Sequence, residues 1–108
     1  MTIELSGISF EGPVPLIGWD PANRAGIYVI LKPTEENTFT RLYVGESGNF
    51  ADRGFPRSHH KFDCWMKNAG SESKLFVALH PMPSSTEEQR KALEQKILEN
   101  RWAPCNER

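Results

Sequence analysis

The chain has 108 residues, a length that predicts one domain, and its 38% hydrophobic and 25% charged residues are ordinary for a globular protein. No apolar run approaches the roughly 20 residues of a membrane helix, and the N-terminus lacks the pattern of a secretory signal. We therefore expect a cytoplasmic protein with no membrane partner. The net charge is −1.

Charge is distributed unevenly along the chain. Residues 1–50 carry three basic and six acidic side chains, whereas residues 51–108 carry ten and eight. A basic cluster within 53–67 comprises Arg53, Arg57, His59, His60, Lys61 and Lys67. Such a cluster suits an anionic ligand, although a solvated helix face explains the same charges equally well.

The two cysteines, Cys64 and Cys105, lie far apart and in no spacing typical of a metal site. One disulfide could join them, but a cytosolic protein favours a reduced pair. A zinc site built on cysteine is not expected.

The first half of the chain predicts an irregular N-terminal segment and then two strands. Residues 1–25 are rich in Gly and Pro, which predicts a short strand or two and a wrapping loop. Residues 26–32 (GIYVILK) form a run typical of a strand buried on both faces. A polar hairpin loop follows, and 41–45 (RLYVG) is the returning strand. Tyr28 and Tyr43 can then share one face of an antiparallel pair.

The second half predicts helices around one further strand. A short helix is expected after Gly45, with caps and breakers drawn from Ser47, Asn49, Asp52, Gly54 and Pro56. Ser58 predicts the start of a second helix that runs to about Asn68 and ends at Gly70. Residues 74–80 (KLFVALH) predict a strand.

The last helix has the clearest start signal, a capping box made by Ser85 with Glu88 or by Thr86 with Gln89. Its apolar positions and its stop signal are Leu93, Ile97, Leu98 and Pro104. The order β-β-α-α-β-α predicts a single α/β domain over 1–108, with helices on the faces of a three-stranded sheet. Residues 1–25 would be an N-terminal extension of a core formed by 26–108.

Glu94 borders the apolar stripe of this last helix. An ionised carboxylate near a core costs several kcal/mol unless it is paired or binds a metal. Two explanations remain open at this point. Either Glu94 pairs with Arg90 or Arg101, or it is a ligand at the floor of a site.

Five anchors in order resemble the GIY-YIG nuclease superfamily, over residues 26–106. They are "GIY" (26–28), "YVG" (43–45), Arg53 ten residues after Tyr43, Glu94 within "ALEQKIL", and Asn106 closing "PCN" twelve residues after Glu94. A single tripeptide would carry no weight, whereas five ordered anchors at the family's usual spacings make a specific signal.

The resemblance implies a small three-stranded antiparallel sheet flanked by helices and a hydrolase that cleaves DNA phosphodiester bonds with one Mg²⁺ or Mn²⁺. Such endonucleases serve in DNA repair, restriction and homing. Carried over, Glu94 is the metal ligand, Tyr28 and Tyr43 are the motif tyrosines, and Arg53 and Asn106 complete the catalytic set. A tyrosine could take the proton from water while Arg53 holds phosphate oxygens. Nucleic acid would also contact Arg57, His59, His60, Lys61 and Lys67.

Three features depart from the family pattern. The loop between the two motifs is long, and Glu46 stands where several relatives have a basic residue, so it would repel phosphate if it faced the site. Arg57 occupies the place where some members carry a histidine, and His59 or His60 comes slightly later. A histidine base is therefore not expected, because paired histidines at a helix start are more often caps or surface residues.

Three functions remain as hypotheses. The first is a metal-dependent DNA endonuclease. The second is a catalytically weak nucleic-acid- or partner-binding module that retains the fold, and Glu46 and the acidic N-terminal half favour it. The third is a toxin or phage-type protein whose target is set by another molecule. The chain contains no second DNA-binding motif, so specificity would come from a protein partner or a second copy of the chain.

Overall fold

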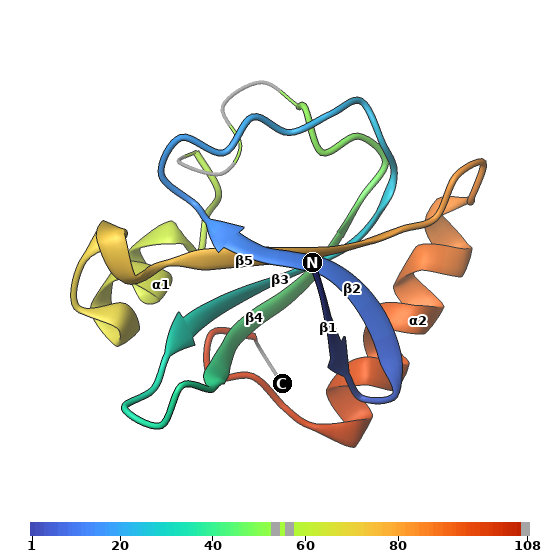
Figure 1. The fold of residues 1–108 in the computed structure, drawn as a ribbon. Coiled ribbons are helices and arrows are strands. Elements are labelled where there is room, and N and C mark those ends of the chain that lie inside the picture. Colours follow the sequence, from blue (N-terminus) through green and yellow to red (C-terminus); the bar gives the residue numbers. More distant parts are fainter. Residues whose placement is uncertain (53–54, 56–57, 107–108) are drawn as a thin grey trace.

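The computed structural model describes residues 1–52, 55 and 58–106 of the chain. It contains one five-stranded antiparallel sheet in the order β1-β2-β5-β3-β4, with two α-helices packed on it (Figure 1). The elements are β1 (Thr2–Leu5), β2 (Ile8–Pro15), β3 (Gly26–Pro33), β4 (Phe39–Ser47), α1 (Phe62–Ala69), the 3-10 helix η1 (Glu72–Lys74), β5 (Phe76–Pro81) and α2 (Glu87–Asn100).

The predicted three-stranded sheet is wrong, because the N-terminal segment contributes two strands of its own. β2 pairs with the edge of β5 that β3 leaves open, and β1 pairs with β2. Three of the Gly and Pro residues that predicted a loop, Gly12, Pro13 and Pro15, lie inside β2, whose register with β5 shifts between Glu11 and Val14. A bulge of this kind tolerates Gly12 and Pro13 without ending the strand. The α/β class of the prediction is retained.

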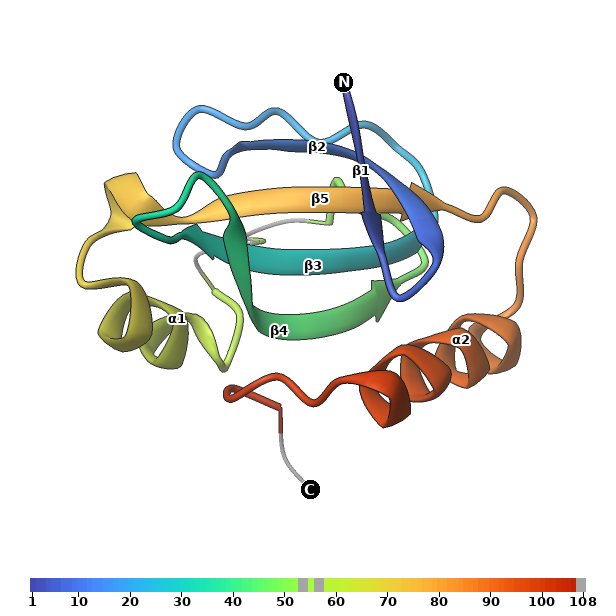
Figure 2. The same cartoon turned by 60° about the horizontal axis from the view of Figure 1, so that its bottom comes forward.

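β3 is an interior strand of the sheet, between β5 and β4, and it separates two hydrophobic clusters. It pairs with β5 on one edge and β4 on the other, and its residues from Gly26 to Leu31 are all buried. Ile27, Val29 and Leu31 join a cluster with Ile97 and Leu98 of α2. The alternate residues join the second cluster, which is closed by α1. This arrangement confirms the prediction of a strand buried on both faces, and α1 and α2 lie on opposite sides of the molecule (Figure 2).

The starts and ends of the two helices agree in part with the sequence prediction. α2 uses the second of the two possible capping boxes, in which Thr86 accepts from the Gln89 N–H and the Gln89 side chain accepts from the Thr86 N–H. α1 starts later than predicted, at Phe62, and ends as predicted at Gly70, whose φ of 90° suits glycine.

The short helix predicted after Gly45 does not form in the described residues of that segment. Ser47 and Asn49 instead exchange turn hydrogen bonds, since the Asn49 N–H donates to the Ser47 hydroxyl and that hydroxyl donates to the Asn49 carbonyl. Such local bonds compete with helix formation. The predicted breakers Gly54 and Pro56 lie outside the described residues.

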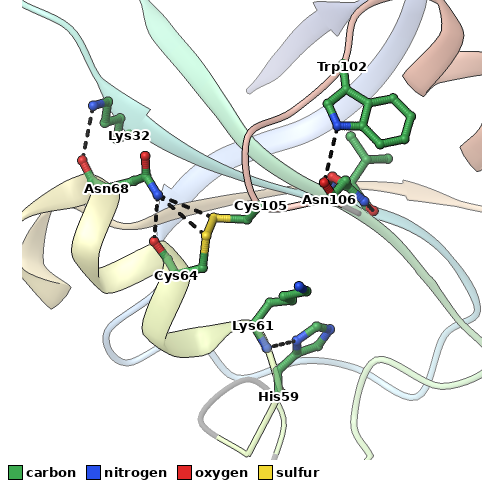
Figure 3. The surroundings of a disulfide bond; sticks show 9 residues. Lys32, His59, Lys61, Cys64, Asn68, Trp102, Cys105 and Asn106 are labelled. Carbon is green, nitrogen blue, oxygen red and sulfur yellow. Dashed lines mark hydrogen bonds between the residues drawn. A yellow bond between two sulfur atoms is a disulfide. The ribbon is translucent and has the colours of Figure 1, made fainter. Parts of the chain in front are cut away.

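A disulfide joins Cys64 of α1 to Cys105 of the C-terminal tail, so the prediction of a reduced pair is wrong (Figure 3). The tail leaves α2 and runs along β4, where the Cys105 N–H donates to the Leu42 carbonyl at 2.8 Å. It therefore covers an edge of β4 that would otherwise be open.

Candidate active site

The two motif tyrosines lie on one face of the sheet, as the strand pattern predicts. Tyr28 of β3 stands opposite Gly45 of β4, and Tyr43 stands opposite Ile30. Both tyrosines belong to the cluster closed by α1, and their ring centroids are 6.1 Å apart. A Cβ on Gly45 would overlap the ring of Tyr28, so glycine is what allows this ring to lie across β4.

Gly26 has a different steric reason to be glycine. It pairs with Pro81 of β5, and a Cβ at this position would overlap the backbone carbonyl oxygen of His80. The glycine of the first motif therefore lets β3 and β5 approach, and the glycine of the second makes room for a tyrosine ring.

Tyr28 is buried in an aromatic cage, with 3% of its surface exposed. Its ring centroid is 4.9 Å from that of Phe55 and 6.5 Å from that of Phe50, and its hydroxyl lies 2.9 Å from His59 Nε2. Burial raises the pKa of Tyr28 far above its usual value, and Tyr43, Glu94 and Glu46 raise it further. Tyr28 therefore stays protonated near neutral pH, and its hydrogen bond with Tyr43 contributes to the increase in its pKa.

His59 supports Tyr28 as a neutral imidazole. Burial first, and then the charges of His60 and Lys61, lower the pKa of His59 to about 4. Its Nδ1 accepts the Lys61 N–H at 3.0 Å, so the single ring proton of the neutral form sits on Nε2 and points at the Tyr28 oxygen. The sequence predicts that His59 contacts nucleic acid. In the structure its ring packs against other side chains, with its centroid 5.0 Å from that of Tyr43 and 4.8 Å from that of Trp65.

The free energy of unfolding should depend on the protonation of His59. Because the pKa of His59 is lower in the fold than its ordinary 6.5, its neutral form stabilises the fold above about pH 6.5, and this contribution is lost as pH falls toward 4. The ring is partly solvated, so the loss should be only on the order of 1 kcal/mol. Urea denaturation at pH 7 and pH 4.5 of wild type and His59→Phe measures it. Wild type should lose more stability between the two pH values than the variant, and equal losses would contradict the assignment.

Glu94 extends from α2 and is half-buried. Within residues 1–52, 55 and 58–106 its carboxylate forms no hydrogen bond or ion pair. Burial raises its pKa, the nearby Glu46 raises it further, and Lys91 opposes both effects. Its charge also contributes to raising the pKa of Tyr28. The alternative in which Glu94 pairs with Arg90 is wrong, because Arg90 is bound elsewhere.

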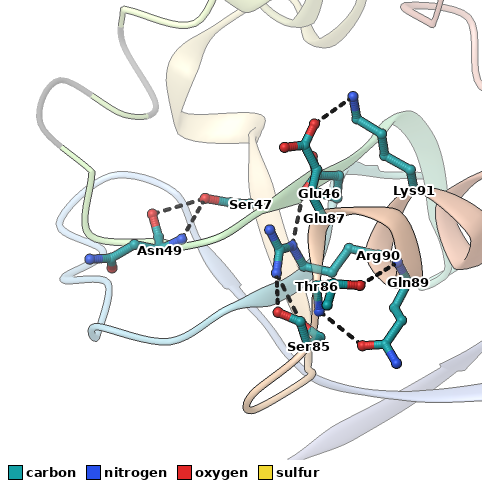
Figure 4. A network of polar contacts seen from close by, with 9 residues as sticks. All are labelled: Glu46, Ser47, Asn49, Ser85, Thr86, Glu87, Gln89, Arg90 and Lys91. Atoms are coloured by element: carbon teal, nitrogen blue, oxygen red, sulfur yellow. Dashed lines mark hydrogen bonds and ion pairs between the residues drawn. The ribbon is translucent and has the colours of Figure 1, made fainter.

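Arg90 forms an ion pair with Glu46, the acidic residue that would repel phosphate if it faced the site. Its Nε donates to a Glu46 oxygen at 2.9 Å, and its second guanidinium nitrogen donates to the Ser85 carbonyl at 2.8 Å (Figure 4). Only 8% of Arg90 is exposed. The charge of Glu46 is therefore balanced inside the fold. The two residues are 44 positions apart, so no local sequence signal could have paired them.

Asn106 holds β4 in place next to the site. Its side-chain carbonyl accepts the Val44 N–H and its amide donates to the Val44 carbonyl, both at 2.9 Å. The backbone carbonyl of Asn106 in turn accepts the indole N–H of Trp102. Asn106 thus pairs with the residue next to Tyr43 as a neighbouring strand would, which indicates a positioning role in this structure.

The basic cluster is described only in part, since Arg53 and Arg57 lie outside the described residues. His60 is exposed and stacks on His59 with ring centroids 4.6 Å apart, and Lys67 is exposed on α1. Lys61 is partly buried at the start of that helix. Of the described members, His59 contacts both tyrosine rings, and His60 lies beside His59.

The assembled site contains a protonated buried tyrosine, a second tyrosine that is partly exposed, and a carboxylate with no partner among the described residues. In that part of the chain no three His, Cys, Asp or Glu side chains gather as a metal cage, and none of its helices is long and apolar enough to cross a membrane. Comparisons with protein-family models, curated proteins and solved structures returned no match.

Proposed function

We propose that this protein is a GIY-YIG-type endonuclease that hydrolyses phosphodiester bonds of DNA with one divalent metal ion. The observation that carries the proposal is the half-buried Glu94 carboxylate, which has no partner in the described chain and lies near enough to the tyrosine pair to raise the pKa of Tyr28. An unpaired carboxylate in such surroundings costs folding free energy, so its presence favours a ligand role.

The donor set fits a Mg²⁺ or Mn²⁺ ion held by Glu94. Mg²⁺ is commonly bound by one or two carboxylates, with water and substrate phosphate oxygens as its other ligands. Glu46 is not available as a second carboxylate while Arg90 holds it. When bound, the ion would polarise the phosphate and stabilise the departing oxygen.

The remaining chemistry falls to the tyrosines. Burial and the contact with Tyr43 raise the pKa of Tyr28, so negative charge is disfavoured on Tyr28 and falls to Tyr43. Tyr43 is also the more exposed of the two. We therefore propose that Tyr43 accepts the proton of the attacking water. Tyr28 has a supporting role, and its oxygen accepts a hydrogen bond from the His59 Nε2–H. Arg53, expected from the sequence to face the phosphate, would complete the site.

Substitution of the two tyrosines tests these roles. Tyr28→Phe and Tyr43→Phe keep the rings that pack against Phe55 and Trp65, so both variants should fold, with a stability loss of about 1 kcal/mol or less for the missing hydroxyl. Both should lose most cleavage, by a factor of about 100 or more, because they remove the proton acceptor or its support. Circular dichroism and single-turnover cleavage measure the two properties. Wild-type rates in both variants would mean that the tyrosines only pack.

The function itself is tested by incubating purified protein with supercoiled plasmid, branched DNA and RNA, in Mn²⁺ and in EDTA. We expect nicking of DNA that requires Mn²⁺. The Glu94→Gln variant, purified in the same way, excludes a contaminating nuclease. Binding to DNA without cleavage by wild type in Mn²⁺ would instead favour a binding module. Because the sequence contains no second DNA-binding motif, cleavage should be weakly sequence-specific unless a protein partner or second copy of the chain contributes.

A further inference from the structure

The ion pair between Glu46 and Arg90 connects α2 to β4 beside the candidate site. Arg90 lies one helical turn before Glu94, so the two side chains leave α2 on the same face. The Arg90 guanidinium reaches Glu46, which directly follows the Tyr43–Gly45 motif, and also reaches both the carbonyl and the hydroxyl of Ser85. One side chain thus joins β4, the turn before α2 and α2 itself (Figure 4).

Along α2, Glu94 lies between the polar attachment at Arg90 and a hydrophobic attachment of the helix to the core. Three and four residues after Glu94, Ile97 and Leu98 enter the core with exposed fractions of 1% and 4%. Leu93 also packs against this core, so the hydrophobic attachment extends from Leu93 to Leu98. The polar attachment holds the first turn of α2 and, together with Leu93, sets where Glu94 lies.

Stability alone gives a weak reason for this arrangement. Buried ion pairs lose much of their Coulomb attraction to desolvation, and a hydrophobic pair of similar size often stabilises a fold as well or better. What a guanidinium adds is direction, since its N–H groups fix the geometry of the groups that they bind.

We propose that Arg90 is a positioning residue that, through Glu46 and Ser85, fixes the Glu94 carboxylate beside β4. The part of this inference that concerns cleavage rests on the proposed endonuclease function. The attachment of α2 can be tested without it.

Three variants separate the possible roles of Arg90. Arg90→Met keeps a long side chain but removes the N–H groups, and it leaves Glu46 unpaired. Glu46→Gln/Arg90→Met removes both charges, so it abolishes repulsion by Glu46 but does not restore the attachment. Lys91→Met is the matched control, since it removes a cation from the same helix whose partner, Glu87, is exposed. Arg90→Lys, which keeps the charge, replaces Arg90→Met if that variant does not fold.

The first readout is amide hydrogen exchange, which reports local opening. Arg90→Met should exchange at least about tenfold faster in residues 87–94, with residues 97–100 changed much less, and Lys91→Met should resemble wild type. Unchanged exchange in 87–94 of Arg90→Met would overturn the proposal.

The second readout is cleavage in Mn²⁺. Arg90→Met should lower kcat by about tenfold or more and leave KM for DNA nearly unchanged, because a misplaced group costs orientation rather than binding. The double variant should remain slow, and its return to the wild-type kcat would show that Arg90 only cancels the charge of Glu46. Faster exchange in Arg90→Met, found together with a wild type that cuts no DNA, would support the attachment and reject the endonuclease.

Discussion

Replacing Glu94 by glutamine should abolish metal-dependent cleavage while leaving the metal-free protein as stable as wild type or slightly more stable. The substitution keeps the volume of the side chain and removes a charge that is half-buried near the core and has no partner among the described residues. Burial and Glu46 raise the pKa of Glu94, which means that the fold opposes its ionised form. Removing that charge therefore does not lower the stability of the metal-free protein.

Activity should respond in the opposite direction. Loss of a group that contributes ~3 kcal/mol or more to transition-state stabilisation lowers the rate by at least about a hundredfold. Thermal melts in EDTA and in Mn²⁺ complete the test, because an ion that binds only the folded protein raises its melting temperature. Wild type should gain stability from Mn²⁺, and Glu94→Gln should not.

Glu99→Gln is the control, since it removes an exposed carboxylate from the same helix. It should cleave DNA and respond to Mn²⁺ as wild type does. A Glu94→Gln protein that is destabilised in EDTA yet still cleaves DNA would show that Glu94 serves the fold through a partner and is not a ligand.

Much of the fold follows from signals that are local in the sequence. The apolar run from Gly26, the capping box at Thr86 and the glycine at position 70 each act within a few residues, and the structure contains β3, α2 and the end of α1 where they predict them. The pairing of β2 with β5 could not be predicted in this way. It depends on which distant strand offers an open edge, and the Gly12–Pro13 pair inside β2 is a local signal for a loop.

The candidate site also combines features that local sequence signals predict with features that depend on distant partners. The spacing of tyrosine and glycine places Tyr28 opposite Gly45, because strand pairing converts a short sequence pattern into a geometry. The roles of His59 and Glu46 were not predictable, because each depends on a partner far along the chain. Tyr28 is 31 residues from His59, and Arg90 is 44 residues from Glu46. Their residue types alone predict a basic surface and a repulsive carboxylate.

The disulfide is the second feature whose loss should have a large effect. It closes a loop of 41 residues between Cys64 and Cys105, and the chain-entropy relation for such a loop gives about 4 kcal/mol of stabilisation. Folded domains of this size are stable by only about 5–15 kcal/mol, so removing the bond would cost a large fraction of the total.

Its position adds a local effect near the tyrosines. The tail that Cys105 anchors ends in Asn106, which holds both backbone groups of Val44, and the helix that Cys64 anchors carries Trp65 against the ring of Tyr43. Opening the bond releases the tail from α1, so the supports on the two sides of Tyr43 are no longer joined. Cleavage should fall under these conditions even at temperatures where the protein remains folded.

Urea denaturation of wild type and of Cys64→Ser/Cys105→Ser, each with and without dithiothreitol, measures the effect. Oxidised wild type should be more stable than the other three samples by about 4 kcal/mol, and those three should agree with one another. The serine variant is the control for the reductant, since dithiothreitol should not change it. Equal stability of oxidised wild type and the serine variant would show that the bond constrains neither the unfolded chain nor the tail beside Tyr43.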